Sequence, residues 1–157
     1  MCGRLSVGKD FLKLLHSAGG CGHDTGDSKG ASGDLLRCRE LRGDTSYTIL
    51  FRFLVRARAG EVIAATELEA DAGRFHAKEW PYAVIELYLG RRSPELTLDD
   101  ANKSDSGCEA QFFTGEWYIL QNKPAEAATS LHKALDTCPE SLWAYGAAQE
   151  ELKRLKP

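Results

Sequence analysis

The sequence predicts an all-α fold made of antiparallel helical hairpins, closed by a C-terminal capping helix. Three observations predict it. From Asp44 onward, apolar residues recur at helical spacing, residues that favour helix starts or stops flank these stretches, and the connections between them are short. We therefore expect residues 44–157 to form one helical domain.

Residues 1–43 have a different composition. They hold nine of the fifteen glycines and three of the five cysteines, and residues 19–33 read GGCGHDTGDSKGASG. Such a segment has almost nothing to bury, so it cannot offset the entropy that ordering would cost. We expect a mostly disordered, Gly-rich head that can be removed without loss of the helical domain.

Length and charge exclude some classes of partner. A chain of 157 residues suits one domain, and a hydrophobic fraction of 43% is ordinary for a soluble globular protein. The 20 basic and 23 acidic residues give a net charge of −3, which offers no electrostatic reason to bind nucleic acid. No apolar run approaches the roughly 18 residues of a membrane span.

The first predicted hairpin joins a helix over about 46–59 to a helix over about 61–75, with Gly60 as the stop between them. The second of these helices presents a narrow stripe of small and apolar residues, which allows close packing on its neighbour: Ala64, Ala65, Leu68 and Ala72. Arg52, Arg56 and Arg58 fall on the opposite side of the first helix, and we interpret them as a solvated face.

The next stretch, EWPYAVIELYLG, predicts a helix that begins near Pro81 and ends at Gly90. Ser93-Pro94-Glu95 opens a short helix, and the polar run 99–107 is expected to be a loop. Three helices follow, over 108–121, 124–136 and 139–155. The last has an apolar face and a charged face that includes Glu151, as expected of a helix that closes a stack.

The helices over 108–121 and 124–136 carry residue types at informative offsets. Gly115 and Ala127 are small, as a close helix crossing requires, and Tyr118 and Leu131 can fill the groove between hairpins. Pro139 ends the second helix. With the small residue Ala134, these positions resemble the 34-residue tetratricopeptide repeat. Gln111 and Thr114 depart from it, since that repeat has Trp and Leu there.

A wider resemblance covers residues 44–157. The blocks WPYAVIELYLG, SPELTLDDA and CEAQFFTGEWYILQNKPAEAATSLHKALDTCPES, in that order, are similar to the C-terminal half of tetratricopeptide lipoproteins of the bacterial NlpI type. The resemblance implies an adaptor that holds proteases or cell-wall hydrolases, with a location in the bacterial envelope favoured over the cytoplasm, and we expect no enzymatic activity. It also implies a partner-binding inner face, here Glu109, Phe112, Glu116 and Ile119. The upstream repeats of such proteins are missing from this chain.

Cys108 starts one helix of the repeat-like hairpin and Cys138 follows the end of the other. The two positions lie at the same end of an antiparallel hairpin, so their Cα atoms can come within the roughly 4.4–6.8 Å of a disulfide. A bridge would point to an oxidising compartment. The alternative is a pair of separate reduced thiols.

Two other functions have weaker support in the sequence. Met1-Cys2-Gly3-Arg4 resembles the start of SRAP-type abasic-site-binding proteins, which would make Cys2 a nucleophile. Cys21 follows Ala18-Gly19-Gly20, an arrangement resembling a lipid-attachment box, but the preceding apolar stretch contains Lys13 and His16 and makes such an anchor an unfavoured interpretation.

No spacing of histidines and cysteines predicts a metal site, and we expect no cofactor. A third interpretation is a truncated repeat protein without a function of its own, since such folds usually need three or more repeats. The two hairpins should leave one apolar flank uncovered, with Tyr47, Leu50 and Phe51 on it. This flank predicts a homodimer.

Overall fold

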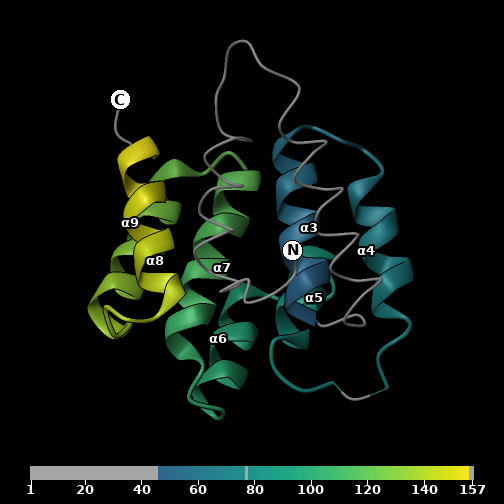
Figure 1. Ribbon diagram of the computed structural model, residues 1–157, viewed down its shortest axis with the longest axis horizontal. Coiled ribbons are helices and arrows are strands. Elements are labelled where there is room, and N and C mark those ends of the chain that lie inside the picture. The colour runs from purple at the N-terminus through teal and green to yellow at the C-terminus, as the bar shows by residue number, and fades with distance from the viewer. Residues whose placement is uncertain (1–45, 77, 156–157) are drawn as a thin grey trace, which may run out of the picture. The chain divides into compact units, whose positions relative to one another are not determined.

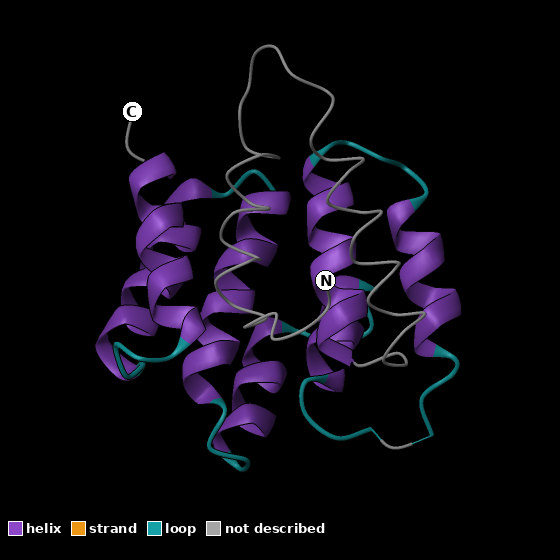
Figure 2. Cartoon of the chain, viewed as in Figure 1, coloured by secondary structure: helices purple, strands orange, loops and turns teal. Residues whose placement is uncertain are grey.

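The computed structural model describes residues 46–76 and 78–155, and these residues form helices and loops with no strand (Figure 2). The all-α prediction is therefore confirmed for this part of the chain, while the predicted head over 1–43 lies outside it. The described residues belong to two compact units, one with residues 46–76 and the other with residues 78–155.

The first unit contains α3 (Ser46–Arg58) and α4 (Ala64–Ala72), labelled in Figure 1. The two helices pack against each other as a hairpin. Gly60 lies in the turn after α3 and has φ +75°, a left-handed conformation that glycine adopts without strain. The buried face of α4 contains Ala64, Leu68 and Ala72, whereas Ala65 is exposed.

Helix α4 is shorter than the predicted span of 61–75. Residues 61–63 form a turn in which the Ala64 N–H donates to the Glu61 carbonyl at 3.1 Å. Val62 is 95% exposed and Ile63 is 52% exposed, so this turn has no buried face to hold it in a longer helix. At the other end, Gly73 caps the helix.

The second unit contains five described helices: α5 (Tyr82–Tyr88), α6 (Pro94–Asn102), α7 (Gly107–Leu120), α8 (Pro124–Thr137) and α9 (Trp143–Leu155). Helix α7 lies at its centre and contacts each of the other four, and α8 also packs on α9. The core is made of side chains from every one of these helices, among them Val84, Ile85, Leu87, Ala101, Phe112, Phe113, Leu131 and Ala148.

Two boundaries differ from those expected. The predicted loop over 99–107 is shorter, because α6 continues to Asn102. Asp100 is held there by ion pairs with Arg92 and with Lys103, the latter at 3.0 Å. The last helix begins at Trp143 instead of Pro139, and residues 139–142 form a turn closed by the Leu142 N–H on the Pro139 carbonyl at 2.9 Å.

Within residues 46–76 and 78–155, no helix combines the length and the apolarity that crossing a bilayer demands.

Candidate functional site

Helices α7 and α8 approach each other closely at Gly115. Gly115 is buried in α7, and a Cβ built on it would lie 2.8 Å from both Cγ and Cδ2 of Leu131 in α8. The same Cβ would be 3.5 Å from the Ala127 carbonyl oxygen. Any side chain at position 115 would have to displace Leu131, so the crossing depends on glycine.

The other repeat-like positions occupy different environments. Ala127, Leu131 and Ala134 are buried in the face of α8 that includes Ser130, and Pro139 is exposed just after the helix. Tyr118 is half-buried near the end of α7, and its ring meets that of Trp117 edge-on at 5.1 Å. Burial raises the pKa of the Tyr118 phenol, and the charges of Glu95 and Glu126 raise it further.

The predicted partner-binding face is largely internal. Phe112 and Glu116 have no exposed surface, and Phe112 meets Phe113 at 5.5 Å and Trp143 at 5.3 Å between ring centroids. Two of the four predicted contact residues are therefore not presented to a partner in this structure. Ile119 is half-buried, and Glu109 is held by contacts within the unit. The sequence could not reveal the burial of Phe112, because that burial depends on where Trp143 packs.

Glu109 links two segments that are distant in the sequence. Its Oε2 accepts a hydrogen bond from the Trp80 indole N–H at 3.0 Å, and its Oε1 accepts one from the Trp143 indole N–H at 3.1 Å. Hydrogen bonds to an ionised carboxylate are stronger than neutral ones. One side chain in the first turn of α7 thus connects Trp80, two residues before the start of α5, with the first residue of α9.

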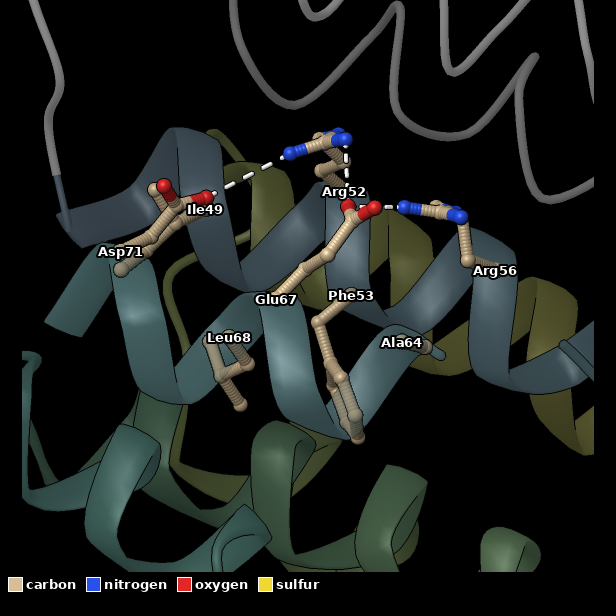
Figure 3. A pocket seen from close by; sticks show the side chains of 8 residues that line it. All are labelled: Ile49, Arg52, Phe53, Arg56, Ala64, Glu67, Leu68 and Asp71. Atoms are coloured by element: carbon tan, nitrogen blue, oxygen red, sulfur yellow. Dashed lines mark hydrogen bonds and ion pairs between the residues drawn. The ribbon is translucent and has the colours of Figure 1, made fainter. Parts of the chain in front are cut away.

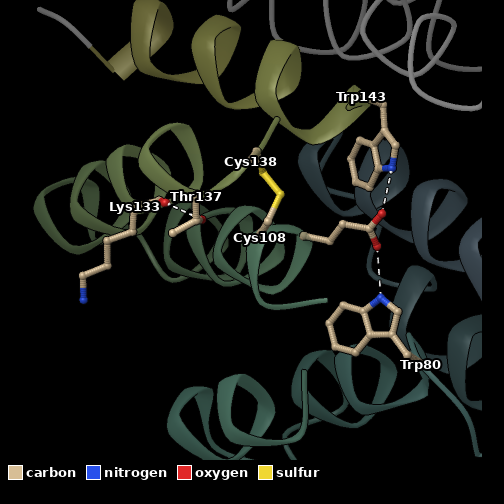
Figure 4. The surroundings of a disulfide bond; sticks show 7 residues. Trp80, Cys108, Lys133, Thr137, Cys138 and Trp143 are labelled. Carbon is tan, nitrogen blue, oxygen red and sulfur yellow. Dashed lines mark hydrogen bonds between the residues drawn. A yellow bond between two sulfur atoms is a disulfide. The ribbon is translucent and has the colours of Figure 1, made fainter. Parts of the chain in front are cut away.

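A disulfide lies beside this bridge. Cys108, in the first turn of α7, is joined to Cys138, the residue after α8, with Cα atoms 5.0 Å apart (Figure 4). This separation lies within the range expected from the hairpin geometry. Figure 4 shows the two indoles and the bridged cysteines in the same neighbourhood, so the covalent bond and the Glu109 bridge act on the same turn.

In the first unit, the arginine face of α3 is not simply solvated. Arg52 pairs with Glu67 at 2.5 Å and with Asp71 at 3.4 Å, and Arg56 pairs with Glu61 at 2.6 Å and also with Glu67 (Figure 3). Burial acts to lower the pKa of Arg56, but hydrogen bonds and the charges of Glu61 and Glu67 raise it above its ordinary value. The interpretation of Arg52 and Arg56 as solvated is therefore wrong.

The spacing of the acidic residues could have indicated this pairing. Glu67 and Asp71 are four residues apart on α4, as Arg52 and Arg56 are on α3, and an antiparallel hairpin sets one pair against the other. The pocket between the helices holds about 10 Å³, no more than one water molecule needs. It offers no room for a substrate.

Several predicted residues fall in other places. Cys2 and Cys21 lie outside the described residues. Leu50 and Phe51 are buried, so they do not form the uncovered flank on which the homodimer prediction depended. Glu151 is also buried and accepts from Arg154 at 3.1 Å, which corrects its assignment to the outer face of the last helix. Across residues 46–76 and 78–155, no three His, Cys, Asp or Glu side chains are grouped so that they could hold a metal ion.

Comparison with known proteins returned no match to a family model and no match to a solved structure.

Proposed function

We propose that the chain is a protein-binding adaptor of the tetratricopeptide-like kind. The observation that carries the proposal is the packing of α7 and α8. Their crossing requires glycine at position 115, where it contacts Leu131. In the sequence α5 and α6 precede this hairpin and α9 follows it, and the hairpin packs against all three. Contacts between alternate helices, α5 with α7 and α7 with α9, are what stacked helical hairpins make.

The inner face of α7 offers Ile119 as its accessible member, with Phe112 and Glu116 buried. A partner surface would therefore include the last turn of α7. The disulfide supports an oxidising compartment, in agreement with an envelope location.

Site-specific cross-linking tests this proposal. A photoreactive residue replaces Ile119 in the full chain, expressed in the cells that make the protein. The matched control carries the same residue at Thr129, an exposed position of α8. We expect position 119 to give one reproducible protein adduct that the control does not give. The proposal fails if a correctly folded chain gives the same adducts from both positions, or none from position 119.

A further inference from the structure

The first turn of α7 holds three parts of the second unit through two adjacent residues. Cys108 is bonded to Cys138 at the end of α8, and Glu109 accepts the indole N–H groups of Trp80 and Trp143. Trp143 is the first residue of α9, and its ring lies 5.3 Å from Phe112 and 5.6 Å from Phe113. The attachment of the start of α9 thus depends on where this turn is held.

No side-chain cap closes that turn, although Ala110 is buried in it and the Asn102 side chain lies against Gly107. The first N–H groups of a helix have no partner within the helix, and Ser106 at the N-cap makes no side-chain hydrogen bond to them. At the end of α8, Cys138 is already extended, its N–H donates to the Ala134 carbonyl at 2.8 Å, and Pro139 follows in the exposed turn to α9. A helix end without capping opens locally unless another contact holds it.

We propose that the Cys108–Cys138 disulfide is a thiol-sensitive latch on the start of α9. When the bond is reduced, the first turn of α7 loosens, the Glu109 bridge to the two indoles opens, and the start of α9 separates from Phe112 and Phe113. Reduction therefore uncovers an aromatic surface that the oxidised protein buries. The latch requires no partner protein, so it stands or falls independently of the adaptor proposal.

The chemical step is ordinary thiol–disulfide exchange with a dithiol reductant. One thiolate of the reductant attacks Sγ of Cys108, the more exposed of the two cysteines, and Cys138 leaves as a thiolate that takes a proton from water. The second thiol of the reductant then attacks the mixed disulfide. The products are two cysteine thiols in the protein and one disulfide in the reductant, so two electrons and two protons have been transferred.

Native-state hydrogen exchange distinguishes the latch from a bridge that acts only on the unfolded chain. The protein is the full chain with Cys2, Cys21 and Cys38 changed to serine, which leaves a single cysteine pair. Exchange is followed without denaturant, before and after reduction by dithiothreitol. We expect the backbone amides of residues 140–147 to exchange about tenfold faster after reduction, the effect of losing one hydrogen bond to a charged group on a local opening.

A bridge that acts only through the entropy of the unfolded state would accelerate only amides that exchange by global unfolding, such as those at the centres of α7 and α8. That pattern, with the exchange of residues 140–147 unchanged, would overturn the latch. The tryptophan emission provides a second readout in the Trp117→Phe background, where only Trp80 and Trp143 remain. We expect a red shift on reduction while far-ultraviolet circular dichroism stays helical.

Glu109→Gln tests the coupling residue itself with the disulfide intact. The two indoles bond different oxygens of Glu109, so in the glutamine variant one of them would face the amide NH2 group, which cannot accept its proton. We expect the faster exchange of the amides of residues 140–147 to appear in this oxidised variant. If Glu109→Gln leaves that exchange unchanged, the disulfide does not act on α9 through Glu109 and the proposal is wrong.

Discussion

Gly115 and Leu131 are in such close contact that the smallest possible side chain on Gly115 would overlap its neighbour. A Cβ at position 115 would lie 2.8 Å from Leu131 Cδ2, well inside ordinary carbon–carbon contact. Since Gly115 lies within α7 and Leu131 within α8, this one contact sets how closely the two helices approach.

Gly115→Ala should therefore destabilise the protein. Overpacking costs about 1–3 kcal/mol, against which alanine recovers up to about 1 kcal/mol of helix propensity. We expect a net loss of about 1–2 kcal/mol in the free energy of unfolding, measured by urea denaturation. Gly73→Ala is the matched control, because its Cβ would meet only backbone oxygens at 3.5 and 3.8 Å. Equal effects at the two positions would contradict the close crossing.

The disulfide should contribute strongly to global stability. Cys108 and Cys138 are 30 residues apart, and closing such a loop is worth about 3–4 kcal/mol in the chain-entropy model. Changing both to serine should lower the free energy of unfolding by about that amount, relative to a chain in which only Cys2, Cys21 and Cys38 are changed. A loss below about 1 kcal/mol would contradict the expected contribution of the bond to the free energy of unfolding.

Tyr118 should make stability sensitive to alkaline pH. Its folded-state pKa is raised by burial and then by the carboxylates of Glu95 and Glu126, so the folded protein holds the phenolic proton more tightly than the unfolded chain does. The corresponding stability is complete below the unfolded pKa of about 10 and is lost as pH rises through the folded pKa.

The phenolate absorbance of wild type minus Tyr118→Phe isolates this residue from the other four tyrosines. We expect the difference curve to have its midpoint above about 10, the value for an exposed tyrosine. Removing one neighbouring charge with Glu126→Gln should move the midpoint down. A midpoint at or below that of an exposed tyrosine would show that the ring is not held in the half-buried position.

The local features of the second unit could be predicted from the sequence. Pro124 marked the start of α8 to the residue, and the small side chains at Gly115 and Ala127 indicated a close crossing. The proximity of Cys108 and Cys138 followed from antiparallel pairing, since a hairpin brings its two outer ends together. In each case the relevant partners are joined by a short turn, and local rules suffice.

Long-range contacts were beyond such reasoning. No local pattern relates Trp80 or Trp143 to Glu109, so the burial of Phe112 and the internal role of Glu109 could not be anticipated. Glu151 was misassigned although its partner Arg154 is only three residues away on α9, because helical spacing does not show that a carboxylate is buried. Phe112 of the predicted binding face is buried because Trp143 of α9 packs against it.

Glu67 provides the last test, in the first unit. It accepts from both Arg52 and Arg56, whose side chains are each only 12% exposed, while its own side chain is 34% exposed. Removing its charge would leave two poorly solvated guanidinium groups with fewer compensating carboxylates. Because the site is partly open to water, the cost should fall below the 3–5 kcal/mol of a fully buried pair, at about 1–3 kcal/mol for Glu67→Gln.

Arg74→Met is the control in the same hairpin. Arg74 pairs with Asp71 at 3.3 Å but is 53% exposed, and an exposed ion pair contributes about 0–1 kcal/mol. Hydrogen exchange of the α3 amides reports the opening of this hairpin in both variants. The tryptophan residues all lie in the second unit, so their fluorescence reports whether the structural change extends beyond the first unit. We expect Glu67→Gln to accelerate α3 exchange well beyond Arg74→Met, and the gap to narrow little in 1 M salt because the arginines are shielded from solvent. Similar exchange rates in the two variants would mean that the arginine face of α3 is solvated after all.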